Sequence, residues 1–226
     1  MRWTLFEDRQ EAGEKLARAL RERYPGRRAG EGDRAAEPPL VLALPRGGVP
    51  VAAAVARELG APLDVLVVRK LGMPGREELA LGAVASGGAQ VLNDDLVRAL
   101  RVPQQELERV LEEELVELRR REREYRGPRP PLDVGGREVV VVDDGIATGA
   151  TMRAAVSALR SAGAKRVMVA VPLASTEACR ELARLADEVV CLETPEPFNS
   201  VGQWYRRFDQ TTDAEVVRAL AETRPA

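Results

Sequence analysis

Four consecutive valines, Val139 to Val142, constrain the fold of this chain more than any other feature. An apolar run without polar alternation predicts a strand that is buried on both faces, and such strands are typical of parallel sheets covered by helices on both sides. Similar runs alternate along the chain with segments whose apolar residues recur at helical spacing. This alternation predicts an α/β fold with a central, mostly parallel, twisted sheet flanked by helices.

The same periodicity predicts where the individual elements lie. We expect strands at residues 40–44, 63–68, 138–142, 166–171 and 188–192, and shorter strands at 82–86 and 90–92. We expect helices at residues 8–24, 49–59, 103–125, 150–162, 176–185 and 213–222, and a loop at 25–39. The chain then forms one domain over residues 1–226, with a core at 40–192, an inserted long helix at about 103–125 and a C-terminal hood or tail at about 194–226.

Composition limits the possible functions. A net charge of -2 without a basic tract argues against nucleic acid as a partner. The chain contains no histidine, which excludes mechanisms that use imidazole as the general base. Two cysteines, Cys179 and Cys191, lack the spacing of a zinc site or a disulfide framework. No signal peptide or membrane-spanning run of roughly 20 apolar residues is visible, so we expect no membrane association and a cytoplasmic location.

The strand of valines leads into the segment DDGIATGAT, which ends in the predicted helix at 150–162. Ligands of open parallel sheets bind at this carboxyl edge of the strands. Glycines, the hydroxyls of Thr148 and Thr151, and a helix N-terminus together suit a phosphate dianion. Asp143 and Asp144 would repel a phosphate, so they need another partner, such as ribose hydroxyls or Mg²⁺ with its waters.

Other motifs that place acids after a strand fit less well. A phosphate-binding loop of the Walker type needs the sequence GK[ST], which is absent. The two adjacent acids do not form the DxD of phosphatases, and the acid pair of a receiver domain lies on the first strand. A strand that is merely capped by acids before a helix remains an alternative.

The strand, the acid pair and the threonine and glycine loop resemble the phosphoribosyl diphosphate signature of type I phosphoribosyltransferases. The resemblance implies that Asp143 and Asp144 hold the ribose 2- and 3-hydroxyls and Mg²⁺ through water. It also implies that the following loop binds the 5-phosphate. The residues of that loop are Gly145, Ala147, Thr148, Gly149, Ala150 and Thr151. The family transfers the ribosyl group through an oxocarbenium-like transition state, which adjacent carboxylates would favour.

Two further segments resemble parts of the same family. Arg46, Gly47 and Gly48 follow the strand at 40–44 and resemble its pyrophosphate loop, in which a non-proline cis peptide often occurs. An ordinary strand-to-helix turn is the alternative reading. Arg69 and Lys70 open the segment RKLGMPGREELALGAV, which resembles the mobile loop of adenine phosphoribosyltransferases, and both side chains could reach pyrophosphate or lie at a solvated strand end.

The acceptor is less well defined than the donor. Enzymes of the family that use 6-oxopurines carry an aspartate at the position of Ala147, and alanine cannot replace it. Glu77 or Glu78 could supply the acid instead, or could be exposed loop residues. We place Glu78 among the candidate catalytic residues, together with Asp143, Asp144 and Lys70.

Aromatic residues gather in the C-terminal segment PEPFNSVGQWYRRF. Trp204 and Tyr205 could form a hood that stacks on the nucleobase, although such residues more often pack a tail onto the core.

The sequence thus predicts an enzyme that transfers ribose 5-phosphate from phosphoribosyl diphosphate to a nitrogenous base, with Mg²⁺ and release of pyrophosphate. A non-catalytic protein of the same fold, which binds the diphosphate or nucleotides as a regulator, is the alternative. A homodimer is expected because dimers are usual in the family and are the commonest closed assembly.

Overall fold

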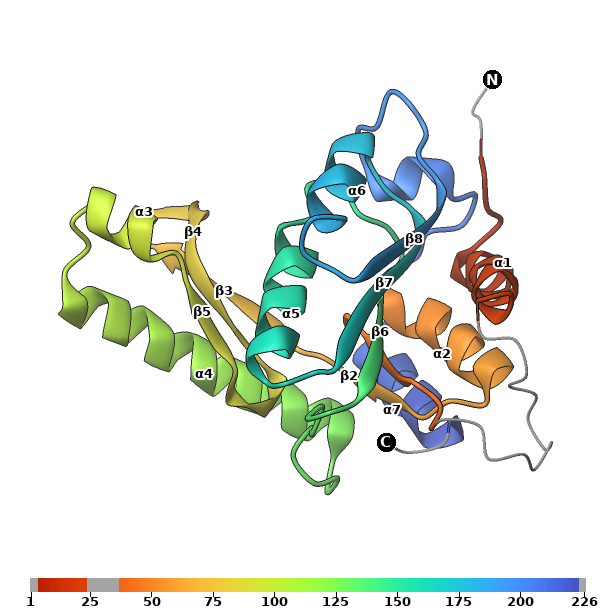
Figure 1. The fold of residues 1–226 in the computed structure, drawn as a ribbon, viewed down its shortest axis with the longest axis horizontal. Helices are drawn as coiled ribbons and strands as arrows, with labels where there is room; N and C mark the ends of the chain where they lie inside the picture. Colours follow the sequence, from red (N-terminus) through yellow and green to blue (C-terminus); the bar gives the residue numbers. More distant parts are fainter. Residues whose placement is uncertain (1–3, 24–36, 224–226) are drawn as a thin grey trace.

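A computed structural model of the chain describes residues 4–23 and 37–223, without the side chains of Glu77 and Glu78. Its centre is a parallel five-stranded sheet in the order β2-β1-β6-β7-β8 (Figure 1). The strands are β1 (Leu40–Ala43), β2 (Leu63–Val65), β6 (Glu138–Val142), β7 (Arg166–Leu173) and β8 (Glu188–Glu193). The predicted α/β class with a parallel sheet is therefore confirmed.

The valines of β6 explain why this strand lies at the centre of the sheet. It pairs with β1 on one side and β7 on the other, and all four valines are buried. Successive side chains of a strand point to opposite faces. Val140 and Val142 accordingly pack into one hydrophobic cluster, while Val139 and Val141 pack into another.

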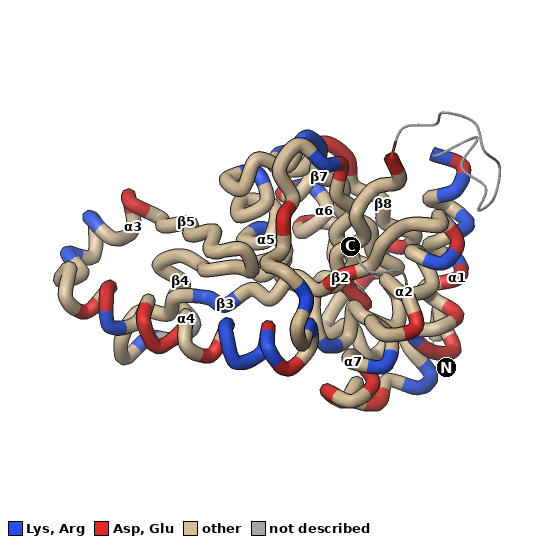
Figure 2. The backbone as a smooth tube through the Cα atoms, turned by 90° about the horizontal axis from the view of Figure 1, so that it is seen from below, with Lys and Arg blue, Asp and Glu red and all other residues tan. Residues whose placement is uncertain are grey.

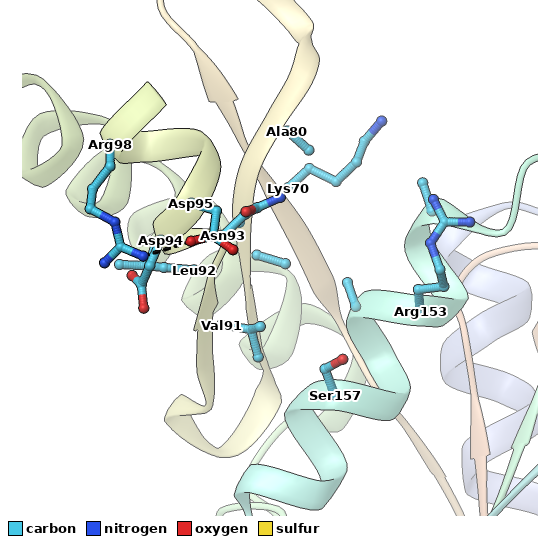
Figure 3. A pocket seen from close by; sticks show the side chains of 14 residues that line it. Lys70, Ala80, Val91, Leu92, Asn93, Asp94, Asp95, Arg98, Arg153 and Ser157 are labelled. Atoms are coloured by element: carbon cyan, nitrogen blue, oxygen red, sulfur yellow. Dashed lines mark hydrogen bonds and ion pairs between the residues drawn. The ribbon is translucent and has the colours of Figure 1, made fainter. Parts of the chain in front are cut away.

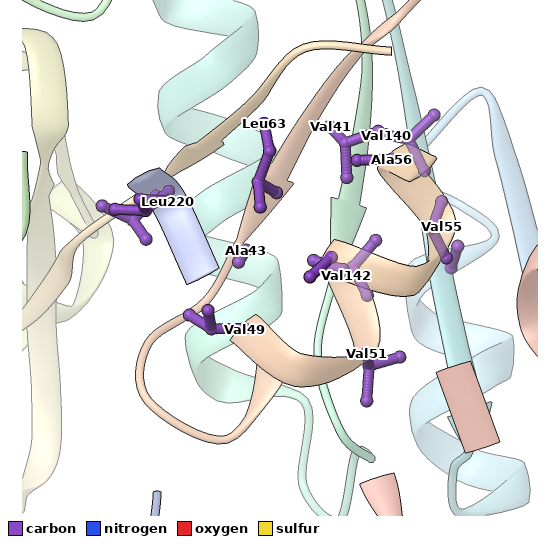
Figure 4. Packing of buried hydrophobic residues seen from close by; sticks show 14 of the residues in the cluster. Val41, Ala43, Val49, Val51, Val55, Ala56, Leu63, Val140, Val142 and Leu220 are labelled. Atoms are coloured by element: carbon purple, nitrogen blue, oxygen red, sulfur yellow. The ribbon is translucent and has the colours of Figure 1, made fainter. Parts of the chain in front are cut away.

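Helices cover both of these faces. α2 (Gly48–Leu59) packs against the face that carries Val140 and Val142, together with α1 (Arg9–Arg21) and α7 (Asp213–Glu222), as Figure 4 shows in part. α5 (Ala150–Ser161) and α6 (Thr176–Leu182) cover the opposite face. None of the described helices is long and apolar enough to cross a membrane.

A second, antiparallel sheet projects from the domain as an arm (Figure 1). It consists of β3 (Val68–Met73), β4 (Arg76–Ala85) and β5 (Gln90–Leu92), with a short 3-10 helix, η1 (Ser86–Gly88), before β5. α3 (Asp94–Ala99) and α4 (Gln104–Arg126) complete the arm. α3 is a helix that the sequence analysis did not predict.

The arm corrects two expectations. The strand expected at 63–68 is two strands, because β2 ends at Val65 and β3 starts at Val68 in the other sheet. The segment after Arg69, expected as a loop, forms the β3–β4 hairpin. The reason is local: Pro74 and Gly75 form the tight turn, and Gly75 has a φ of 74°, a conformation in which glycine carries no steric cost.

A buried ion pair fixes the end of α4 to the central sheet. Arg126 donates from Nε and Nη2 to the two carboxylate oxygens of Asp64 on β2, each at 2.9 Å. Side-chain exposure is 7% for Arg126 and 1% for Asp64. A bidentate pair of this kind sets the position and the orientation of the helix end.

The C-terminal tail packs beside the start of the chain. Residues 194–212 are irregular, as expected, apart from a 3-10 helix, η2 (Val201–Trp204). Phe6 forms a β-bridge with Tyr205, and the two rings lie 5.5 Å apart. The helix expected at 8–24 ends at Arg21, and most of the loop expected at 25–39 falls outside the described residues.

Candidate active site

Strand β6 delivers the acid pair to the carboxyl edge of the central sheet. Asp143 follows Val142 directly, and its Oδ1 accepts a hydrogen bond of 2.8 Å from the backbone N–H of Asp144. Asp144 in turn accepts a bond of 2.6 Å at its backbone carbonyl from the hydroxyl of Tyr205. The two acids are thus held by the strand on one side and by the C-terminal tail on the other.

Arg9 supplies the positive charge beside this pair. Its Nε donates to Asp144 Oδ2 at 2.7 Å, and the two side chains are only 12% and 13% exposed. Its Nη1 donates to the backbone carbonyl of Asp209 at 2.6 Å, and its guanidinium lies 3.8 Å from the ring centre of Phe208. Three contacts therefore hold Arg9 against Asp144.

The electrostatic environment disfavours two charges on the acid pair. Burial raises the pKa of Asp143 well above its usual value of 3.8, and the charge of Asp144 raises it further. Burial also raises the pKa of Asp144, an effect that Arg9 opposes. Perturbed pKa values beside a charged partner are typical of functional sites.

The phosphate loop predicted at residues 145–151 lies directly after the acids. Gly149 adopts a φ of 73° and caps the N-terminus of α5, while Ala147, Thr148 and Thr151 are exposed. A side chain at Gly145 would collide with Val201, since a Cβ there would lie 2.6 Å from its Cγ1. The loop therefore presents two hydroxyls and a helix N-terminus to solvent, an arrangement that suits an anion.

Residues of β7 and the following loop support the phosphate loop. Ile146 donates its backbone N–H to the carbonyl of Leu173 at 3.0 Å and accepts one from Ser175 at 2.9 Å. The hydroxyl of Ser175 donates to the carbonyl of Ala147 at 2.7 Å. Arg153 donates to the carbonyl of Thr148 at 2.8 Å. The loop is consequently preorganised by bonds that leave its two threonine hydroxyls available.

The loop that contains Arg46 meets the acid pair at the same sheet edge. A Cβ on Gly47 would lie 2.1 Å from Asp144 Oδ2, and one on Gly48 would lie 2.9 Å from the Cα of Asp143. A side chain at Gly48 would collide with the backbone of β6, and one at Gly47 would displace the carboxylate of Asp144, so the two glycines allow this close approach. The peptide bond between Pro45 and Arg46 is cis, as the family resemblance implies.

Arg46 lies close to an acidic residue of the C-terminal helix α7. Its Nη1 lies 3.7 Å from Oδ1 of Asp213, the first residue of α7. The same carboxylate oxygen accepts a bond of 2.7 Å from the hydroxyl of Tyr125 near the end of α4. Asp213 thus lies between the arm and Arg46, and part of the Arg46 environment comes from outside the βαβ core.

The hairpin separates the two bases that the sequence analysis grouped together. Arg69 donates from Nε to Glu114 of α4 at 2.6 Å. Lys70, one residue further along β3, points the other way and lines a cavity of about 570 Å³ between the arm and α5. Arg153 lines the same cavity next to the phosphate loop (Figure 3). Only Lys70 of the two bases therefore faces the phosphate loop.

The remaining candidates lie at two places. Glu77 and Glu78 are part of β4, and their side chains are outside the described structure. Tyr205 is 4% exposed, and its ring lies 5.0 Å from that of Phe208. Burial raises the pKa of Tyr205, so its hydroxyl stays a donor to Asp144. Trp204 is half-buried, and its backbone carbonyl accepts from Leu5 and Phe6.

Sequence reasoning missed four polar residues that the structure places around the predicted loops: Arg9, Ser175, Arg153 and Asp213. Ser175 could have been found, because it follows the buried strand β7 at the same sheet edge as Asp143. Nothing in the local sequence of Arg9 or Asp213 indicates their contacts. Both belong to terminal helices that meet the site only after folding.

Comparison with known proteins agrees with this geometry. Residues 14–206 match the phosphoribosyl transferase domain family. A protein from two strains of Mycobacterium tuberculosis, provisionally named a phosphoribosyl transferase, is 48% identical over 216 residues. The match covers 96% of this chain but only 46% of that protein, so the chain spans about half the length of these relatives.

Two further matches differ in extent. The crystal structure of TT1426 from Thermus thermophilus is similar with a TM-score of 0.83 and 46% identity, and the match covers 97% of this chain and 99% of TT1426. The uracil phosphoribosyltransferase of Clostridioides difficile is 39% identical over 59 residues, which is 26% of this chain and 28% of that enzyme.

Proposed function

Because this chain belongs to the phosphoribosyl transferase domain family, we propose that it transfers ribose 5-phosphate from phosphoribosyl diphosphate to a nitrogenous base and releases pyrophosphate. The single observation that carries the proposal is the meeting of two loops at one sheet edge. The phosphate loop and the loop of Arg46 both lie next to Asp143 and Asp144. A phosphate, a ribose and a diphosphate could therefore be bound side by side.

Each group of residues has a distinct role in this proposal. The phosphate loop with Thr148 and Thr151 holds the 5-phosphate through backbone N–H groups, hydroxyls and the N-terminus of α5. Asp143 and Asp144 accept hydrogen bonds from the ribose hydroxyls and favour the positive charge that develops at carbon 1. Arg46 and Lys70 stabilise the negative charge of the departing pyrophosphate.

Magnesium fits the donor set only in part. Carboxylate oxygens are ligands that Mg²⁺ prefers, but the described residues contain no group of three or more possible protein ligands. Asp144 also forms an ion pair with Arg9, which partly neutralises its charge. We therefore propose that Asp143 and Asp144 would hold Mg²⁺ through water. When bound, Mg²⁺ neutralises charge on the diphosphate.

The acceptor is assigned only as a nitrogenous base, and the group that exchanges a proton with it lies on the arm or in the C-terminal tail. Trp204, which is half-buried, remains the proposed hood residue over the base. Tyr205 is buried and would act by holding the backbone of Asp144 rather than by stacking on the base. Glu78 remains the proposed acid of the arm. A homodimer and a cytoplasmic location stay predictions from the family and from composition.

A pyrophosphate-release assay tests the proposal. The protein is incubated with Mg²⁺, phosphoribosyl diphosphate and single bases, beginning with uracil because of the 59-residue match, followed by purines, other pyrimidines and pyridines. We expect release with at least one base and none from Asp143→Asn/Asp144→Asn. Absence of release with every base, for a protein that binds the diphosphate, would refute catalysis.

A regulatory protein of the same fold is the second candidate. Ala147, which cannot serve a purine nitrogen as the family's aspartate does, motivates it. Calorimetry with phosphoribosyl diphosphate would then show binding that the double aspartate variant loses, without turnover. If the wild-type protein does not bind the diphosphate, both candidates fail.

A further inference from the structure

A second cavity lies on the arm, at the end of α4 that joins the central domain. It has a volume of about 470 Å³, within the range of small-molecule sites. Its walls come from the last turns of α4, from residues 127–132 and from η1. The lining residues of the proposed active site do not take part in it.

Arginines dominate the walls of this cavity. The charged residues that line it are Arg119, Glu122, Arg123, Arg126 and Arg129. Arg119, Arg123 and Arg126 are spaced four and three residues apart, so they share one face of α4. Figure 2 shows the basic segments at this end of α4. We call the two exposed residues of this face, Arg119 and Arg123, the arginine stripe.

The arginine stripe differs from the other arginines of the helix. Arg109 and Arg120 each form ion pairs with two glutamates of α4, and Arg121 pairs with Glu117. Arg119 and Arg123 are exposed and make no ion pair with any described residue. Their charges are therefore available to a ligand.

The floor of the cavity is rigid. Arg126, which is buried, is fixed by its bidentate pair with Asp64, and Arg129 donates to the carbonyl of Leu220 at 2.7 Å. Gly88 leaves the opposite wall open, because a Cβ there would meet no atom within 4 Å. The part of the lining formed by Arg126 and Arg129 is thus fixed in place before a ligand arrives, which lowers the entropic cost of binding.

We propose that this cavity binds a small molecule that carries two or more linked phosphates. Four arginines line one hollow, and Glu122 is the acid on its walls. Asp64 already neutralises Arg126 and lies 3.9 Å from Arg129, so the charge offered to a ligand comes from the arginine stripe. Guanidinium groups match phosphate oxygens in charge and in geometry. The volume accommodates a nucleoside polyphosphate, but the lining contains no aromatic side chain for a base, so the linked phosphates are the recognised group.

Calorimetry with inorganic tripolyphosphate tests the site. Titrations use the full chain with Arg46→Gln, so that binding at the proposed diphosphate loop does not dominate. We expect Arg119→Gln/Arg123→Gln to weaken the Kd at least tenfold. The matched control, Arg120→Gln/Arg121→Gln, removes the same charge from the same helix and should change the Kd less than twofold. Both variants should melt at the same temperature as the parent protein when unfolding is followed by circular dichroism, which verifies that they fold.

Three outcomes decide the proposal. Weaker tripolyphosphate binding by Arg119→Gln/Arg123→Gln, without a change in the control variant, supports the proposal. A parallel titration with ATP shows whether a nucleoside adds affinity to that of the phosphates. Equal losses in both variants would show that only net charge matters and would overturn it. A 20-nucleotide RNA that binds more tightly than tripolyphosphate, and loses binding in the stripe variant, would overturn the small-molecule assignment. None of these results depends on transferase activity.

Discussion

Arg9 and Asp144 form an ion pair of 2.7 Å between the first helix and the acid pair, although they are 135 positions apart in the sequence. Both side chains are nearly excluded from solvent, so the pair is screened little by salt. The N-terminal helix is thereby tied to the centre of the proposed site.

Replacing Arg9 by Gln should destabilise the protein. It leaves the Asp144 carboxylate in a buried position without its cation, which costs about 3 kcal/mol in comparable pairs. Chemical denaturation at neutral pH should show this loss in the free energy of unfolding. The double variant Arg9→Gln/Asp144→Asn should recover part of it.

Arg21→Gln is the matched control on the same helix. Arg21 pairs with Glu58 at 2.8 Å, but its side chain is 60% exposed. Exposed pairs contribute about 0.2–1 kcal/mol, so this variant should unfold close to the wild type. Similar losses for Arg9→Gln and Arg21→Gln would contradict the role of burial.

Asp143→Asn should stabilise the fold while it removes function. Burial raises the pKa of Asp143 in the folded protein, whereas the unfolded chain ionises normally, so at neutral pH the acid costs folding free energy. An asparagine Oδ1 can still accept the bond from the backbone N–H of residue 144. Thermal denaturation should show a gain of about 1 kcal/mol, or about 2–4 °C in Tm.

Binding of phosphoribosyl diphosphate to the same Asp143→Asn variant should weaken. A stability gain together with a loss of ligand affinity would show that the buried charge is kept for function rather than for folding. A variant that melts lower than the wild type would indicate instead that the carboxylate is a structural element.

The sequence predicted the local parts of this site and missed the distant ones. The local parts depend only on neighbours in the sequence, so strand and turn chemistry places them. They are the four valines, the acids after them and the glycines of the two loops. The same role was predicted for Arg69 and Lys70, but successive side chains of β3 point to opposite faces of its sheet. Arg69 therefore contacts Glu114, and Lys70 lies on the other face. Arg9 and Asp213 could not be placed, because tertiary packing alone brings the terminal helices to the sheet edge.

The buried pair of Arg126 and Asp64 should control how the arm is attached. Arg126→Met leaves Asp64 buried and without its bidentate partner, for which a loss of about 3–5 kcal/mol is expected. The double variant Asp64→Leu/Arg126→Met should be far closer to the wild type, because the buried carboxylate is removed together with its partner, and Arg129, 3.9 Å from Asp64, keeps its bonds to the carbonyls of Leu63 and Leu220. Denaturant titrations of both variants and of the exposed control Arg120→Gln measure these differences. A single variant as stable as the control would contradict this attachment.

Cys179 on α6 should react with alkylating agents at lower pH than an ordinary thiol. The nearby thiol of Cys191 on β8, whose Sγ donates to the backbone carbonyl of Glu193 at 3.1 Å, lowers the pKa of Cys179 to about 7 from an ordinary value of 9.0. Since the thiolate is the nucleophile, alkylation of Cys179 by iodoacetamide should rise steeply through pH 7. Cys191→Ala removes the thiol that lowers this pKa, so the midpoint should move upward and the rate at pH 7 should fall about tenfold or more. Cys191→Ser retains a hydroxyl donor and should keep most of the reactivity. Mass spectrometry of the peptide that contains Cys179 measures each rate, and an unchanged pH midpoint in Cys191→Ala would show that the two thiols do not interact.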